Sequence, residues 1–403
     1  MRRLLPFFVA LLAVAFFTKV DFFFYLLYTL FGIYFLGRLW ARRSLATVTL
    51  LRRHDERVFL GETVPVEVVV HNRGWLPVLW LRVHDSVPGE ISSFRLFRRI
   101  VSLKPHERLT LAYDLVGRRR GYYRLGPLVA LGGDLLGSTT YEHRYSGQDF
   151  VIVYPKIVAL RDLDLPSQSP FGTLPSRQRL FEDPTRIQGV RDYEPGDSLR
   201  RMDWKTSARL GALQVRRYEP AISLETAILL NLNSDDYPTR YRRPATELGI
   251  VIAASLAVHL VEKRQAVSLF TNGRDPFQEQ PEGDGVILPP PERPARKGRE
   301  HLMHLLDLLA RIEASSGEGT MPFLDLLSRK SLGLPWGSTV VIVTAREVEG
   351  LVDMLLALRR RGLFVILLTT CPDRNFPLTA RRAAQVGAHA FRLWSEQDLE
   401  LWR

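Results

Sequence analysis

The sequence predicts a multidomain protein in three parts: a helical hairpin in a membrane, a β-sandwich, and an α/β domain with a mostly parallel sheet. Three changes in the hydrophobic pattern predict these parts. Two long apolar runs come first, then short segments of period two, then apolar strands that alternate with amphipathic helices. The expected boundaries are 1–43 for the hairpin, 44–155 for the sandwich, 156–188 for a linker, 189–218 for a charged central stretch and 219–403 for the α/β domain.

The N-terminal part contains the apolar runs Leu4–Phe17 and Phe22–Leu36, with a short polar segment between them. One helix through both runs would be far longer than the roughly 20 residues that a span needs, so two helices joined by a turn are expected. Arginines precede the first run and follow the second, whereas Lys19 is the one cation in the turn. The positive-inside rule therefore predicts a two-pass protein of the inner (cytoplasmic) membrane, with the bulk of the chain in the cytoplasm.

Two alternatives concern this N-terminal part. A cleaved signal peptide would use Ala13-Val14-Ala15 as its small-residue cleavage site. The second apolar run follows at once and would still anchor the chain, so the hairpin is the preferred interpretation. An exported adhesin would need the opposite topology.

Strand-like alternation begins after the hairpin. Val64, Val66, Val68 and Val70 fall on one face of a strand, and two further groups repeat the pattern. These groups are Leu79, Leu81 and Val83, and Leu109, Leu111, Tyr113 and Leu115. Several short strands without intervening helices predict a small immunoglobulin-like β-sandwich.

The C-terminal part alternates strands and helices. Strands are expected at Thr226–Leu232, Ala266–Phe270, Thr339–Thr344, Leu363–Thr369 and Ala388–Leu393. Helices are expected at 245–262, 300–313, 321–330, 347–361 and 379–385. Residues 272–298 contain five prolines between Pro281 and Pro294, show no periodicity, and are predicted to form a loop. Because the strands are almost wholly apolar, the sheet should be parallel and covered on both faces.

Composition limits the classes of function. A formal charge of +12 favours anionic partners, either acidic lipid or nucleic acid. The cations are scattered among acids and no nucleic-acid-reading motif accompanies them, so no nucleic-acid partner is predicted. The lone Cys371 excludes an internal disulfide and a cysteine-built zinc site, which fits a reducing cytoplasm.

The central stretch, GVRDYEPGDSLRRMDWKTSARLGALQVRRY, combines both signs of charge with an aromatic side chain. Pro195 and Gly196 predict a turn, after which Asp197 is expected to cap a helical segment Ser198–Ala208. In one interpretation these charges form a docking surface or a site for an anionic group. In the other, Arg191, Asp197, Arg200 and Trp204 form a buried ion-pair lock between two domains. The lock is the preferred interpretation, because ion-pair networks are often structural.

This stretch resembles the core motif of the domain of unknown function 58 (DUF58) family. The matching residues form the predicted interaction site: Arg191, Tyr193, Gly196, Asp197, Arg200, Asp203, Trp204, Ser207 and Arg209. The resemblance implies a prokaryotic source and a C-terminal domain of the von Willebrand factor A type, which is Rossmann-like. It also implies association with a MoxR-type AAA+ ATPase in the assembly or remodelling of envelope-linked complexes.

Von Willebrand factor A-like domains often bind a divalent cation through Asp-x-Ser-x-Ser, with a Thr and an Asp from later loops. Here the corresponding positions are Asn231, Asn233 and Asp235, and Thr320 could match the loop threonine. Mg²⁺ requires well-placed oxygen ligands. The sequence therefore predicts a degenerate site without metal, and no cofactor.

The sequence has no G-x-S-x-G elbow, P-loop or H-E-x-x-H motif. A membrane-anchored, non-enzymatic interaction or scaffold protein is therefore predicted. The alternative is a hydrolase that uses Asp192, Asp197 and Asp203 as acid/base or metal groups. Carboxylates in an open pocket without arginine partners would favour the hydrolase, whereas paired carboxylates would argue against it.

Overall fold

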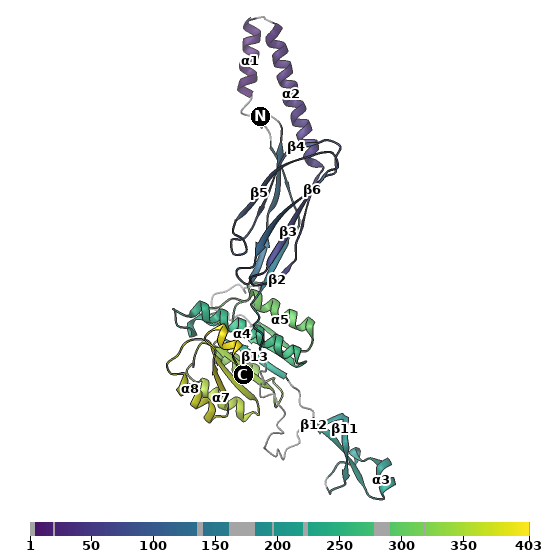
Figure 1. Ribbon diagram of the computed structural model, residues 1–403, viewed down its shortest axis with the longest axis vertical. Coiled ribbons are helices and arrows are strands. Elements are labelled where there is room, and N and C mark those ends of the chain that lie inside the picture. Colours follow the sequence, from purple (N-terminus) through teal and green to yellow (C-terminus); the bar gives the residue numbers. More distant parts are fainter. Residues whose placement is uncertain are drawn as a thin grey trace. The chain divides into compact units, whose positions relative to one another are not determined.

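A computed structural model of the protein shows a mixed α/β, multidomain chain (Figure 1). The structure describes residues 5–18, 21–134, 140–160, 182–195, 197–220, 225–277, 291–317 and 319–402. The chain divides into two compact units. One contains Met1–Lys156 with Leu306–Arg311, and the other contains Ile157–Leu305 with Ile312–Arg403.

The first unit begins with α1 (Leu5–Thr18) and α2 (Asp21–Ala46), which contact each other (Figure 1). α2 is long and apolar enough to cross a membrane. It continues past the predicted boundary at residue 43, and its last turn buries Leu45. α4 (Arg242–Glu262) is equally apolar but is mostly buried inside the second unit, where it is a core helix. An apolar helix near the N-terminus is therefore present, and the number of spans and the topology stay predictions.

The strand-rich part contains β1 to β10, which form three sheets around one core. The strands are β1 (Val48–Arg53), β2 (Arg57–Phe59), β3 (Thr63–Asn72), β4 (Val78–Ser86), β5 (Leu96–Leu103), β6 (Arg108–Val116), β7 (Gly121–Leu125), β8 (Leu128–Gly133), β9 (Thr140–Arg144) and β10 (Asp149–Tyr154). The sheet orders are β1-β3-β6, β5-β4-β8-β9 and β2-β10-β7. The immunoglobulin-like class of this part stays a prediction.

The period-two pattern predicted the inward faces well, with one exception. The valines of β3 at 64, 66, 68 and 70 are all buried, as expected. On β4, Leu81 and Val83 are buried but Leu79 is 44% exposed. A register shift between Val78 and Leu81 in the β4–β5 pairing places Val78 inside instead. The prediction for Leu79 was wrong because a β-bulge changes which residues share a face.

The second unit contains a six-stranded sheet of order β15-β14-β13-β16-β17-β18. Its strands are β13 (Glu225–Leu230), β14 (Ala266–Thr271), β15 (Glu292–Arg296), β16 (Thr339–Thr344), β17 (Phe364–Thr369) and β18 (His389–Arg392). Its helices, besides α4, are α5 (Arg299–Arg311), α6 (Phe323–Ser331), α7 (Leu351–Arg360), α8 (Phe376–Gln385) and α9 (Glu396–Glu400). All strand pairs are parallel except β14–β15, so the predicted parallel sheet is confirmed.

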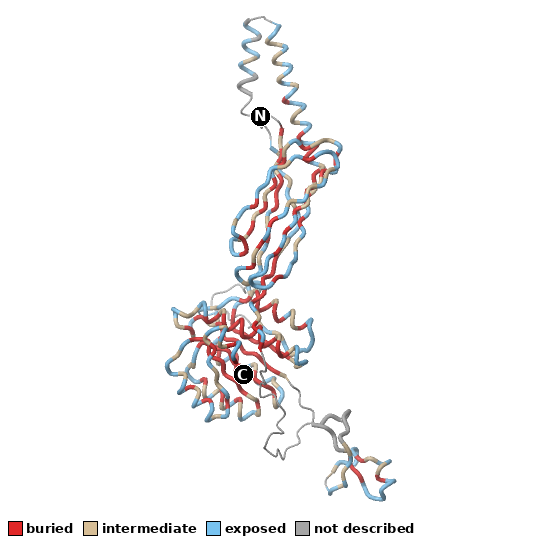
Figure 2. Tube along the Cα trace, in the orientation of Figure 1, coloured by how far each residue is buried: buried red, intermediate tan, exposed pale blue. Residues whose placement is uncertain are grey.

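Helices cover both faces of this sheet, and its central strands are buried (Figure 2). Ala227 and Leu229 of β13 pack with residues of α6, α7 and α8. Leu230 points to the opposite face, toward α4, where a Cβ on Gly249 would lie 3.2 Å from its Cδ1. A glycine at this position lets α4 approach the sheet closely.

Two predicted boundaries were wrong, and one helix was missed. The loop expected over 272–298 contains β15, an antiparallel edge strand. The linker expected over 156–188 already includes the start of β11 (Glu182–Asp192). A short last helix, α9, follows the final strand and was not predicted.

Candidate functional site

The carboxyl ends of β13, β14, β16, β17 and β18 meet at one edge of the parallel sheet. From β13 the chain first forms β14 on one side and later β16 on the other side. Ligands of open α/β sheets usually bind in the crevice at such a topological switch point.

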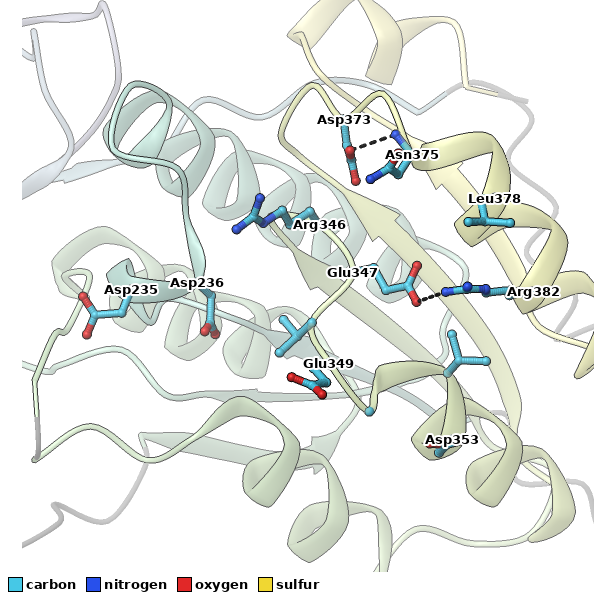
Figure 3. Close-up of a pocket in the computed structure, with 13 residues that line it drawn as sticks. Asp235, Asp236, Arg346, Glu347, Glu349, Asp353, Asp373, Asn375, Leu378 and Arg382 are labelled. Atoms are coloured by element: carbon cyan, nitrogen blue, oxygen red, sulfur yellow. Dashed lines mark hydrogen bonds and ion pairs between the residues drawn. The ribbon is translucent and has the colours of Figure 1, made fainter.

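A cavity of about 770 Å³ lies at this edge (Figure 3). Its walls come from the loops after β13, β16 and β17, from the beginning of α7 and from α8. The lining residues are Asp235, Asp236, Arg346, Glu347, Val348, Glu349, Gly350, Val352, Asp353, Asp373, Asn375, Leu378 and Arg382. The cavity is therefore predominantly acidic, with two arginines.

Asn231 occupies the position where a metal-binding domain would have its first aspartate. Its side-chain N–H donates to Asp236 at 2.8 Å and to the Thr344 hydroxyl at 3.1 Å. Its side-chain oxygen accepts from the Asn233 N–H and from Asn272. A buried amide donor thus joins the ends of β13 and β16, and its orientation presents N–H rather than oxygen to Asp236. The absence of a metal from this site stays a prediction.

The other residues of the predicted site lie around the same loop. Asp235 is exposed and accepts the Gly317 N–H at 3.2 Å, while Gly317 O accepts the Thr320 N–H. Among the described ranges of the chain, no three His, Cys, Asp or Glu side chains form a group that could hold a metal ion. His301 is buried and its Nε2 lies 2.8 Å from Val267 O, whereas His304 is exposed, so they do not share a site.

The central stretch folds into a small unit of its own elements: β11, a 3₁₀ turn η1 (Leu199–Arg201), α3 (Trp204–Leu210) and β12 (Gln214–Pro220). β11 and β12 pair antiparallel. Asp203, not Asp197, caps α3 by accepting the Thr206 N–H at 3.0 Å. Gly211 ends the helix at φ 67°, a left-handed conformation that favours glycine. The predicted helix Ser198–Ala208 is therefore wrong at its start.

Ser207 joins the two halves of this unit. Its hydroxyl donates to Asp203 O at 2.8 Å and accepts the Gln214 N–H at 2.8 Å, and its side chain is buried. Tyr193 is half-buried, and its N–H donates to Leu213 O. Ser207 therefore has a structural role, whereas the bond given for Tyr193 comes from its backbone. Gly196 lies outside the described residues.

The three carboxylates of the hydrolase alternative all have local partners. Asp197 accepts from Arg191 at 2.5 Å and from the Glu194 N–H, and the Arg191 bond lowers the pKa of Asp197 below its usual value. The Thr206 N–H, with Arg216, lowers the pKa of Asp203. Asp192 accepts from Gln214. The observation that would have favoured the hydrolase is therefore not met at these residues.

The prediction of a buried ion-pair lock was wrong for two of its four residues. Arg191 and Asp197 pair, but within the β11–η1 region. Arg200 is exposed, and the Trp204 side chain is 66% exposed. The competing interpretation, a docking surface, agrees better with these side chains.

The exposed side chains of η1 and α3 are here called the motif surface. They are Leu199, Arg200, Arg201, Trp204, Lys205, Arg209 and Leu210. α3 has seven residues and is therefore only about 10 Å long, so these groups lie within a small area. Three large apolar side chains and four cations are thus presented together.

Comparison with known proteins places the central stretch in a family. The model of the family described as "Protein of unknown function DUF58" matches residues 189–367. This confirms the family predicted from the central motif, and residues 189–367 belong to the DUF58 family. The "Uncharacterized protein YeaD" of Bacillus subtilis (strain 168) is 23% identical over 301 residues, which cover 73% of this chain and 68% of that protein.

Two solved structures show more distant similarity. One is titled "von Willebrand factor type A from Catenulispora acidiphila" and is 8% identical, with a TM-score of 0.31. That match covers 47% of this chain and 42% of the other. The other is the CARDB domain of the PF1109 protein from Pyrococcus furiosus, which is 23% identical with a TM-score of 0.21. It covers 26% of this chain and 91% of the domain.

Proposed function

We propose that this protein is a membrane-anchored, non-enzymatic scaffold that captures a protein partner through its motif surface. The observation that carries this proposal is a contrast between two groups of side chains in the family motif. Its carboxylates are engaged in local hydrogen bonds, whereas Leu199, Trp204 and Leu210 are exposed beside cations. Tryptophan and arginine are enriched among the residues that dominate binding energy in protein interfaces.

The proposed partner is a MoxR-type AAA+ ATPase, as the family resemblance implies, in the assembly or remodelling of envelope-linked complexes. The chemistry of the motif surface defines what such a partner must offer. Trp204 needs an apolar recess, and the surrounding Arg200, Lys205 and Arg209 need nearby carboxylates. Charge complementarity of this kind speeds association and excludes wrong partners.

The proposed anchor is the pair of N-terminal helices, with the remaining chain in the cytoplasm. α2 is sufficiently long and apolar for a span, and arginines 38, 42 and 43 lie in its C-terminal part. Cations on this side of a span favour a cytoplasmic position. A relative in Bacillus subtilis agrees with a bacterial source.

A capture experiment tests the proposal. The full chain, held in detergent, is immobilised and offered the purified MoxR-type ATPase of the same organism. We expect retention by the parent and loss of retention by Leu199→Ala/Trp204→Ala. The matched control is Trp75→Ala, which removes a 76% exposed tryptophan from the other unit. Equal retention by the parent and the double variant would contradict the role of the motif surface.

A further inference from the structure

The cavity at the carboxyl edge has unbalanced charge. Six carboxylates and two guanidinium groups line it. Arg382 is engaged by Glu347 at 3.1 Å, which leaves Arg346 as the second cation. Glu349 and Asp353 are exposed and make no hydrogen bond or ion pair with any described residue. An occupant of this cavity should therefore carry positive charge.

Apolar groups also reach into the lining. Val348 and Val352 are half-buried and line the cavity. Leu378 also lines it and is 49% exposed (Figure 3). A small hydrated cation would leave these side chains uncovered. A cationic protein segment with its own apolar side chains would cover them.

The motif surface has the complementary chemistry. Arg200, Lys205 and Arg209 are exposed and form no ion pair within the described part of the chain. Leu199 and Trp204 lie next to Arg200 and Lys205 in the sequence and are 64% and 66% exposed. A 3₁₀ turn and a two-turn helix form this surface, and the cavity is a hollow at the sheet edge.

We propose that the motif surface of one copy docks into the acidic cavity of a second copy of this chain. Arg200 and Lys205 would face Glu349 and Asp353, and the leucine and tryptophan would cover the apolar wall. Two different surfaces meet in such a contact, so it is heterologous and joins copies head to tail. The inference goes beyond the proposed function and does not depend on the ATPase. Because both bindings use the motif surface, they exclude each other.

Sedimentation of the detergent-solubilised full chain over a range of concentrations tests this inference. We expect concentration-dependent association at low salt that is lost near 1 M salt, where the screening length falls to about 3 Å. Charge reversal on either side, Arg200→Glu/Lys205→Glu or Glu349→Lys/Asp353→Lys, should raise the dissociation constant about tenfold or more. A chain with all four changes regains complementarity and should associate again.

Controls separate specific pairing from total charge. Arg329→Glu and Glu67→Lys reverse exposed charges elsewhere and should leave association unchanged. Asp353 lies in the first turn of α7, where a positive charge would destabilise the helix. Glu349→Gln/Asp353→Asn is therefore a milder variant, which removes the two charges and keeps the size of the side chains. The cavity variants should still capture the ATPase, which distinguishes failure of this inference from failure of the proposed function.

Three results would overturn the inference. They are a parent chain that stays monomeric at every concentration and salt level, reversal variants that associate like the parent, and a fourfold variant that does not recover.

Discussion

A buried arginine in the strand-rich unit provides the sharpest prediction about stability. Arg52 on β1 donates to Asp85 through Nε at 3.0 Å and Nη2 at 2.5 Å, and to Asp149 at 2.7 Å. Asp85 also accepts the Tyr113 hydroxyl at 2.7 Å. The side chains of Arg52 and Asp85 are 1% and 0% exposed. Burial and the neighbouring Asp85 raise the pKa of Tyr113, so its hydroxyl stays protonated as a donor.

Arg52→Ala leaves Asp85 buried with one neutral donor. Breaking a buried ion pair from one side costs about 3–5 kcal/mol, because the remaining charge has lost its partner in a poorly solvated place. Arg53→Ala is the matched control, since Arg53 is the next residue on the same strand and is exposed. Its removal should change the free energy of unfolding by less than about 0.5 kcal/mol.

Amide hydrogen exchange of β3 measures this loss, because it reports the opening of one part of a multidomain chain. Each 1.4 kcal/mol corresponds to a factor of ten, so exchange at the buried valines of β3 should accelerate by roughly two to three and a half orders of magnitude. Exchange as slow in Arg52→Ala as in Arg53→Ala would refute the reasoning.

Three further predictions concern topology, metal binding and pH. A reporter fused after Arg403 that is active only outside the cytoplasm should be inactive, and activity would contradict the topology. Calorimetry should detect no micromolar Mg²⁺ affinity, because the Asn231 amide donates to Asp236. A micromolar affinity that is lost in Asp235→Ala would contradict this prediction. Burial lowers the pKa of His301, so the α/β unit should lose stability as the pH falls below about 6.5, where the unfolded chain binds the proton first. His301→Gln should flatten this dependence in thermal melts, and an unchanged slope would contradict it.

The α/β unit was largely predictable because its strands are short apolar runs with helices between them. The limits of the expected strand at 339–344 coincide with β16. β15 was missed because its sequence, ERPAR, is polar and contains Pro294, which only an edge strand or bulge tolerates. α9 was missed because it has five residues, and its capping box at Ser395 is its main local signal.

The interior of the strand-rich unit was less predictable. Arg52 shares the inward face of β1 with Val48 and Leu50, whereas Leu51 points outward and is 42% exposed. A prediction based on apolar cores would place Leu51 inside and Arg52 outside. Its partner Asp85 is 33 residues away and comes from another sheet, so no local pattern indicates the pair.

Local sequence patterns also failed to predict details of the candidate sites. Asp197 was predicted to cap the helix of the central stretch, but Asp203 caps it. Asp197 is engaged by Arg191 and the Glu194 N–H, while Met202 is buried and bridges to Val215, so the helix starts after it. The acidic cavity gathers residues from three separate loops, which only the strand order brings together.

Hydrogen exchange of the full chain with and without the MoxR-type ATPase tests the central claim most directly, because it maps which backbone segments a partner covers. The account predicts new protection in peptides that span η1 and α3, residues 199–210, and none there when Leu199→Ala/Trp204→Ala is used. Protection by the bound ATPase that falls elsewhere and leaves 199–210 exchanging as in the free chain would contradict the claim.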